Sequence, residues 1–198
     1  GRKAPHPVTA RSGMDLEAWE EELNGITTSE SLEGRLDYLI GGDAYFARLE
    51  TAVREATTCV DLQTYIFDND DVAHNVADLL RDRSEEIGVR VLFDGLGTLL
   101  AQGATAPTLP DTHRPPACMT RYLQTDSRVE VRSIENPWLT GDHCKNIVVD
   151  RRIAFLGGMN IGREYRHEWH DMMLEVQGPV VAALQREFEV TWARSGPR

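Results

Sequence analysis

The stretch GDHCKNIVVDRRIAFLGGMN, residues 141–160, places a histidine, a lysine and an asparagine around a short apolar run. If its first residues form a strand, alternation puts His143 and Lys145 on one face and Cys144 on the other, in the core. An imidazole beside an ammonium can attack a phosphorus atom while the ammonium neutralises the phosphate oxygens. The glycines allow the backbone to approach closely, and the Asn160 amide can donate to the same anion. This spacing predicts phosphate chemistry through a histidine.

The elements that must hold this stretch show helical and strand periodicities. Apolar residues recur at helical spacing over residues 41–56, with Asp43 as the expected N-cap. A strand is predicted over Cys59–Phe67, and Asp70 or Asp71 is expected to cap the helix that follows it.

The second half of the chain continues with short strands and ends in a helix. Residues 94–118 are rich in glycine and proline and follow a strand, which predicts a long loop bordering the site. A final helix is expected over 179–192, with Pro179 in its first turn. The further strands are predicted at 89–94, 128–134, 146–150, 153–158 and 172–176.

The order of these elements predicts the fold class. A strand, a helix and a strand follow one another between residues 59 and 94, which favours a parallel pair with a right-handed crossover. We therefore expect an α/β fold in which a mixed, largely parallel sheet is flanked by helices on both faces. Residues 1–34 are polar and are expected to form a loosely attached arm with one short helix at 15–25. Residues 35–198 are then a single domain.

Composition limits the partners and the location. The 198 residues carry a net charge of -11, which argues against binding nucleic acid through many phosphate contacts. Cys59, Cys118 and Cys144 form no C-x-x-C pair, so they support no disulfide framework or structural zinc site and indicate reduced thiols on a cytoplasmic face. No apolar run reaches the roughly 18 residues that span a bilayer, so no transmembrane segment is expected within the chain.

His143, Lys145, Asp150 and Asn160 match, position for position, the HxKxxxxD motif with trailing GxxN, and in this motif the chain resembles the phospholipase D superfamily. The surrounding segments are similar to its cardiolipin synthase-like branch, so the resemblance covers about residues 35–195 and implies the phospholipase D-like fold. These segments are GGDAYFARLETAVREATTCVDLQTYIFDND, VRVLFDGLGT, VVDRRIAFLGGMNIGREY and WHDMMLEVQGPVVAALQREFEVTW.

The resemblance implies a role for each matched residue. His143 would be the nucleophile or the general acid. Lys145 and Asn160 would bind the phosphate, and Asp150 would support the local fold rather than touch substrate. Asp171 stands where the resemblance places an acidic residue that orients the histidine. Other residues expected around the substrate are Gly158, Gln63 and Tyr65.

The family's active site combines two such motifs, yet these residues hold one. One histidine forms the phosphohistidine and the other protonates the leaving alkoxide. The second half is expected either in cis or from a homodimer partner, and the resemblance and abrupt chain ends favour the first half of a two-motif protein. The implied activity is cleavage of a phospholipid or other phosphodiester, or phosphatidyl transfer, in the cytoplasm or peripherally at the inner membrane.

Two further functions remain alternatives: a homodimeric nuclease on the same fold, and a catalytically silent binding or scaffold half. No cofactor is expected. The cluster HEWHD, with His167 and His170, mixes metal-ligand types but lacks the H-E-x-x-H spacing, so no metal site is predicted there.

Overall fold

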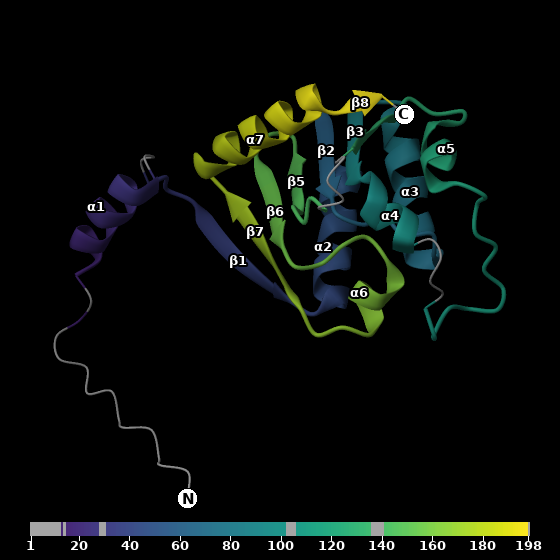
Figure 1. The fold of residues 1–198 in the computed structure, drawn as a ribbon, viewed down its shortest axis with the longest axis horizontal. Helices are drawn as coiled ribbons and strands as arrows, with labels where there is room; N and C mark the ends of the chain where they lie inside the picture. Colours follow the sequence, from purple (N-terminus) through teal and green to yellow (C-terminus); the bar gives the residue numbers. More distant parts are fainter. Residues whose placement is uncertain (1–12, 14, 28–30, 102–105, 136–140, 198) are drawn as a thin grey trace, which may run out of the picture. The chain divides into compact units, whose positions relative to one another are not determined.

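One mixed β-sheet organises residues 34–198 in the computed structural model, which describes residues 13, 15–27, 31–101, 106–135 and 141–197 (Figure 1). Within these residues, eight strands lie in the order β1-β7-β6-β5-β2-β3-β4-β8. The strands are β1 (Arg35–Ile40), β2 (Cys59–Thr64), β3 (Gly88–Asp94), β4 (Glu130–Ile134), β5 (Asn146–Val149), β6 (Ile153–Gly157), β7 (Met172–Gln177) and β8 (Gly196–Pro197). The helices are α1 (Leu16–Thr27), α2 (Gly42–Glu55), α3 (Asp71–Ser84), α4 (Gly95–Ala101), α5 (Met119–Gln124), α6 (Arg163–His167) and α7 (Val180–Arg194).

The pairing of the strands confirms the α/β class and the mixed sheet. Parallel pairing joins β2 to β3 and β3 to β4, as the crossover between them predicts. The other five ladders are antiparallel, so the expectation of a largely parallel sheet holds only for β2, β3 and β4. The short turn at 150–152 explains this result for β5 and β6, because a connection of that length can join only antiparallel neighbours.

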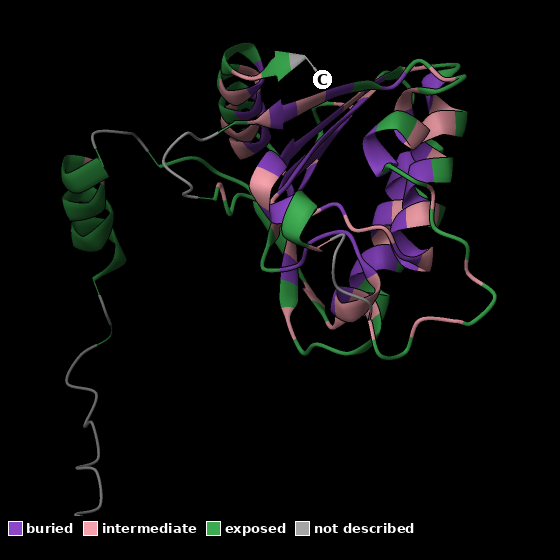
Figure 2. Ribbon diagram, turned by 45° about the vertical axis from the view of Figure 1, so that its right-hand side comes forward, coloured by how far each residue is buried: buried purple, intermediate pink, exposed green. Residues whose placement is uncertain are grey.

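Helices cover both faces of the sheet, as predicted (Figure 2). On one face α2, α3, α5 and α6 contribute to the main core, in which Phe46 and Leu62 are fully buried. On the other face α7 packs Val181 against Val148, and its Phe188 clusters with Leu92 of β3. The sheet is therefore buried on both sides along its middle strands.

Helix boundaries follow the capping chemistry at two places. The prediction of Asp70 as a cap is confirmed, because Asp70 Oδ1 accepts a hydrogen bond from Ala73 N at 2.8 Å. The prediction of Asp43 is wrong: α2 begins one residue earlier, and Gly41 holds the N-cap position with φ 81°. Glycine adopts this left-handed conformation without the steric cost that other residues meet.

Several short elements had no clear periodicity and were not predicted. They include β1, α5, α6, β8 and also α4, which replaces the start of the loop expected at 94–118. Within that segment residues 102–105 lie outside the described residues, and residues 106–118 are irregular, as expected of a loop.

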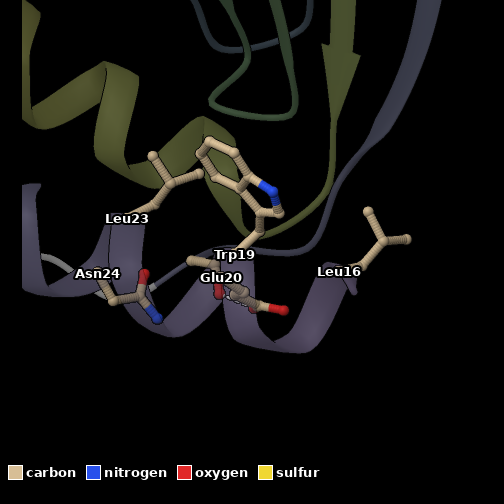
Figure 3. Close-up of a pocket in the computed structure, with 6 residues that line it drawn as sticks. Leu16, Trp19, Glu20, Leu23 and Asn24 are labelled. Carbon is tan, nitrogen blue, oxygen red and sulfur yellow. Dashed lines mark hydrogen bonds between the residues drawn. The ribbon is translucent and has the colours of Figure 1, made fainter. Parts of the chain in front are cut away.

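The chain divides by its internal contacts into two units, Gly1–Glu33 and Gly34–Arg198. In the first unit the expected short helix is α1, and Asp15 Oδ1 accepts a hydrogen bond from Ala18 N at its start. Residues 1–12 and 14 of the predicted arm lie outside the described residues. Apolar and polar side chains of α1 border a groove within this unit (Figure 3); the lining residues are Leu16, Trp19, Glu20, Leu23, Asn24 and Ser31. Among the described helices of both units, none is apolar over enough residues to cross a membrane.

Candidate active site

Tyr65, just after β2, lies at the centre of the candidate site. The ring of His143 stacks on the Tyr65 ring, with the centroids 3.8 Å apart and the planes inclined by 21°. Lys145 Nζ lies 5.3 Å from the centroid of the same ring. Two backbones approach this ring closely, because a Cβ atom on Gly97 or Gly141 would come within 2.5 Å of Tyr65 Cε2. Tyr65 thus joins α4 to the segment that precedes β5.

His143 and Lys145 do not lie on a strand, so that part of the prediction is wrong. β5 begins only at Asn146, and residues 141–145 are irregular. The two residues are held together instead by a hydrogen bond in which Lys145 Nζ donates to the backbone oxygen of His143 at 2.8 Å. Because strand alternation does not apply here, Cys144 is exposed rather than in the core.

A buried carboxylate fixes the segment before His143. Asp94, at the end of β3, is 1% exposed, and its two oxygens accept hydrogen bonds from Gly97 N at 2.7 Å and Asp142 N at 3.0 Å. Gln63 Nε2 donates to Asp142 Oδ2 at 3.3 Å. Sequence reasoning missed Asp94, because a single acidic residue at the end of a strand has no spacing that marks it as part of a site.

Asn160 is buried beside the segment that follows β2. Its Oδ1 accepts hydrogen bonds from Ile66 N at 3.1 Å and from Thr64 Oγ1 at 3.4 Å. Phe67 and Ile161 form an isolated parallel bridge next to these bonds. The amide oxygen of Asn160 is therefore occupied by protein donors, and its Nδ2 group, which also interacts with the Tyr165 side chain, is the edge that can donate to an anion.

Asp171 lies directly before β7, against Gly158, which follows β6. Its backbone oxygen accepts a hydrogen bond from Gly41 N at 2.9 Å, and its Oδ1 accepts one from Met172 N at 2.7 Å. A Cβ atom on Gly158 would overlap the Asp171 carboxylate, so glycine is required there for close approach. Within the described residues no hydrogen bond joins Asp171 to the His143 ring, which contacts Tyr65 instead.

The Lys145 ammonium is half-buried, and its burial and its charged neighbours shift its pKa in opposite directions. Burial lowers the pKa of Lys145 below its ordinary value, while neighbouring groups, including Asp142 and Asp171, act to raise it. A phosphate bound beside this ammonium would add negative charge and favour the protonated form.

Asp150 does not belong to this group, because it lies beyond the opposite end of β5. Its carboxylate accepts hydrogen bonds at 2.7–3.1 Å from the backbone N–H groups of Thr57, Thr58 and Cys59, and also from the two threonine hydroxyls. Partial burial raises the pKa of Asp150, but these bonds outweigh it and hold the pKa well below the ordinary value. Asp150 thus ties the β5–β6 turn to the start of β2.

The histidines of HEWHD are exposed. His167 Nδ1 lies 3.8 Å from Asp43 Oδ1, and His170 is on the surface. Across the described part of the chain no three His, Cys, Asp or Glu side chains are grouped as metal ligands would be.

A protein-family model described as "Cardiolipin synthase, PLD-like domain" matches residues 49–192. The chain belongs to this family. The matched residues of the PLD-like domain include Tyr65, His143, Lys145, Asn160 and Asp171. The resemblance to the phospholipase D superfamily, in its cardiolipin synthase-like branch, is thereby confirmed.

Named relatives of this PLD-like domain are longer proteins. It is 33% identical over 171 residues to cardiolipin synthase A of Pseudomonas fluorescens strain SBW25, covering 78% of this chain and 32% of the relative. It is 29% identical over 203 residues to cardiolipin synthase 1 of Bacillus anthracis, covering 94% of this chain and 36% of the relative. The chain therefore spans about a third of the length of these relatives.

Among solved structures the PLD-like domain is similar to Nuc, a phospholipase D family member from Salmonella typhimurium. The TM-score is 0.64 at 15% identity, over 84% of this chain and 99% of that one. NucT from Helicobacter pylori matches with the same TM-score at 13% identity, over 84% of this chain and 100% of that one. At such identities the likeness concerns the fold, and it confirms the phospholipase D-like fold that the motif implied.

Proposed function

We propose that this PLD-like domain supplies one half of an active site that cleaves or transfers a phosphodiester through a phosphohistidine. The observation that supports the proposal best is the grouping of His143 and Lys145 around Tyr65, in a domain of the cardiolipin synthase family. An imidazole that is exposed next to an ammonium suits attack on a phosphorus atom whose oxygens carry negative charge.

The proposed reaction has two steps in which His143 is the nucleophile. A ring nitrogen of His143 attacks phosphorus, and the bond from phosphorus to the leaving oxygen breaks as that oxygen takes a proton from the imidazolium of a second histidine. The second imidazole then removes a proton from water or an alcohol, whose oxygen attacks the phosphohistidine and releases His143. With the roles exchanged, His143 is the acid and then the base.

The remaining residues are proposed to hold the substrate and the histidine. Lys145 and the Asn160 Nδ2 group would stabilise the charge on the phosphate oxygens in the transition state. Asp171 would orient the His143 imidazole and stabilise its cation. In this scheme side chains supply the charge, and no cofactor is invoked. The other residues proposed to border the substrate are Gly158, Gln63 and Tyr65.

We propose a phospholipid as the substrate and water or an alcohol, such as a glycerol headgroup, as the acceptor. The names of the relatives support this choice, since both are cardiolipin synthases. The net charge of -11 disfavours nucleic acid as the substrate. A cytoplasmic location, or a peripheral one at the inner membrane, is proposed from Cys59, Cys118 and Cys144, which are free thiols.

The test is an assay with vesicles of phosphatidylglycerol, in which glycerol release and cardiolipin formation are followed by mass spectrometry. The exchange His143→Asn is expected to lower the rate by about 1,000-fold or more, because it removes the side chain that acts as the nucleophile or as the general acid. Protein quenched at alkaline pH and digested is expected to carry a phosphorus adduct on the peptide that contains His143.

The matched control is His167→Asn, which changes an exposed histidine outside the group around Tyr65. Its rate is expected to stay within about twofold of the wild type. A wild-type rate that survives His143→Asn rules out the phosphohistidine. Histidine-dependent cleavage of plasmid DNA without lipid turnover would assign the site to a nuclease instead.

A further inference from the structure

The carboxylate of Asp94 joins two segments that are far apart in the sequence. Asp94 ends β3 and is 1% exposed, so its burial keeps it away from a bound substrate. One oxygen accepts a hydrogen bond from Gly97 N, in the first turn of α4, and the other accepts one from Asp142 N, directly before His143. The side chain therefore connects α4 to the segment that carries the proposed nucleophile.

Both of these segments lie against the Tyr65 ring. A Cβ atom on Gly97 would come within 2.5 Å of Tyr65 Cε2, and so would a Cβ atom on Gly141. These two backbones are named the walls of the Tyr65 slot. Asp94 binds the N–H of Gly97 itself and the N–H of the residue that follows Gly141. The ring between the walls stacks on His143, so the width of the slot sets the place of the imidazole.

Asp142 connects Asp94 to the turn that contains His143. Asp142 Oδ1 accepts a hydrogen bond from Cys144 N at 2.9 Å, which closes the backbone around His143. Asp142 Oδ2 accepts one from Gln63 Nε2 at 3.3 Å, which ties the same turn to β2. Residues 141–145 are irregular and have no strand partners of their own, so these bonds restrain them.

We propose that Asp94 is a positioning residue of the active site, which places the His143 imidazole by holding both walls of the Tyr65 slot at once. This inference rests on the proposed function, in which His143 attacks phosphorus or transfers a proton. Either step requires reacting atoms about 3–3.5 Å apart, and a displacement of about 1 Å can lower the rate by about 100-fold. Asp94 contacts neither the substrate nor the imidazole and acts through the slot.

The exchange Asp94→Asn releases one wall, because an amide carries only one acceptor oxygen. That oxygen can accept from Gly97 N or from Asp142 N, and the amide NH₂ group then faces the other N–H, donor against donor. The size of the side chain is unchanged, so the packing around it keeps its volume. We therefore expect the slot to open on one side without the loss of the fold.

The experiment measures lipid turnover per folded chain with the same phosphatidylglycerol vesicles. Asp94→Asn is expected to lower kcat by about 10–100-fold, because the imidazole is displaced from the phosphorus atom. KM is expected to change by less than about fivefold, because Asn160 is held by β2 and the segment after it and not by Asp94. In NMR spectra the ring protons of His143 are expected to lose much of the ring-current shift that Tyr65 causes.

The matched control is Asp61→Asn on β2. Asp61 is also 1% exposed, and its oxygens accept hydrogen bonds from Arg90 Nε at 2.6 Å and Gln185 Nε2 at 2.8 Å, outside the slot. This exchange is expected to lower the midpoint of urea denaturation, because it weakens a buried ion pair. Its kcat per folded chain is expected to stay within about twofold of the wild type, with the His143 spectrum unchanged.

The comparison of the two exchanges decides between positioning and stability alone. A kcat and a His143 spectrum in Asp94→Asn that equal those of the wild type overturn the proposal. An equal loss of kcat per folded chain in Asp94→Asn and Asp61→Asn also overturns it, since any buried carboxylate would then have the same effect.

Asp142→Ala is the second variant, and it decides the question if Asp94→Asn does not fold. Asp142 is half-buried, and alanine keeps the N–H that binds Asp94 but removes the acceptor for Cys144 N. This exchange is expected to lower kcat by roughly 3–10-fold and to reduce the ring-current shift of His143 in part. A wild-type rate and spectrum in Asp142→Ala overturn the proposal.

The two readouts separate a failure of this inference from a failure of the proposed function. If His143→Asn abolishes turnover while Asp94→Asn keeps the wild-type kcat and spectrum, the positioning role fails and the histidine chemistry stands. If the wild type shows no turnover that depends on His143, the proposed function fails. The His143 spectrum of Asp94→Asn then still tests whether this carboxylate places the imidazole.

Discussion

The imidazole of His143 lies face to face with the phenol ring of Tyr65, at 3.8 Å between the ring centroids. The Tyr65 ring is in turn enclosed by the backbones of Gly97 and Gly141. An exposed histidine on an irregular segment has many rotamers available, and a fixed aromatic platform reduces that freedom. Tyr65 is therefore expected to act as a positioning residue for the proposed nucleophile.

Replacing Tyr65 is expected to release the His143 ring. Tyr65→Leu removes the platform and is expected to lower kcat/KM by about 10–100-fold, the range that misplacement of a reacting group produces. Tyr65→Phe keeps the ring and is expected to stay within about threefold. In NMR spectra the ring protons of His143 are expected to lose their ring-current shift in Tyr65→Leu and to keep it in Tyr65→Phe. Equal spectra for the two variants would show that the stack does not persist in solution.

Gly97→Ala is expected to be destabilising although alanine favours helices. In α4 the exchange gains about 1 kcal/mol of helix propensity. The new Cβ atom, however, comes within 2.5 Å of Tyr65 Cε2, and Gly141 closes the other approach to the same ring. Overpacking of this kind costs about 1–3 kcal/mol, so the net effect is a loss of stability or a displaced Tyr65 ring.

Urea denaturation and the His143 ring-current shift together measure the outcome for Gly97→Ala. The control is Gly196→Ala in β8, where an added Cβ atom meets nothing within 4 Å. Gly196→Ala is expected to stay within about 0.5 kcal/mol of the wild type. A more stable Gly97→Ala variant with an unshifted His143 spectrum would contradict the close packing around Tyr65.

Long periodic segments explain why much of the fold was predictable from the sequence. The apolar stripes of α2, α3 and α7 and the alternating or continuously apolar strands from β2 to β7 depend on local patterns, which survive in the structure. β1 was missed because its apolar residues do not separate onto a buried face: Leu36, Tyr38 and Ile40 are exposed, and the other face carries the half-buried Asp37 and Leu39. Its partner β7 lies more than 130 residues away in the chain.

The candidate site was predictable in its residue types but not in its geometry. Spacing alone identified His143 and Lys145, because the motif is a local pattern. Their arrangement depends on contacts between distant segments, namely the stacking on Tyr65 and the support of Asp142 by Asp94. A single buried aspartate such as Asp94 has no spacing that distinguishes it from any strand-terminal acid, so only the fold reveals it.

Asp150→Asn is expected to destabilise the domain near neutral pH. The asparagine keeps one acceptor oxygen and tolerates the left-handed conformation at this position, where φ is 53°. It loses the charge and one of the two oxygens that accept from Thr57, Thr58 and Cys59. Hydrogen bonds to a charged group contribute about 1.5–3 kcal/mol, so urea denaturation at pH 7 is expected to show a loss of about that size.

The effect of Asp150→Asn is expected to shrink in acid. Hydrogen bonds hold the pKa of Asp150 in the folded state below the unfolded value of about 3.9, so the unfolded chain binds the proton first as pH falls. The stability from this carboxylate is thus complete above about pH 5 and is lost progressively as pH falls from the unfolded pKa of about 3.9 through the lower folded pKa. A constant difference between wild type and Asp150→Asn from pH 7 to pH 3 would contradict a role for the charge. Lipid turnover per folded chain is expected to change little, since Asp150 lies beyond the far end of β5.

Asp68→Asn is expected to act in the opposite direction. Burial, together with the charges of Asp70 and Glu164, raises the pKa of Asp68 to about 6. Between the unfolded value of about 3.9 and this folded value the native state binds more protons than the unfolded chain, so stability falls as pH rises through that window. Asp68→Asn removes this pH dependence. The variant is expected to be more stable than the wild type by roughly 1 kcal/mol at pH 8 and equally stable near pH 4. The expected gain is small because Asp68 is partly open to solvent, which screens its charge.

Urea denaturation from pH 4 to pH 8 measures the difference, with Asp82→Asn on the exposed side of α3 as the control that keeps the wild-type profile. Parallel stability curves for the wild type and Asp68→Asn would show that this carboxyl titrates alike in both states.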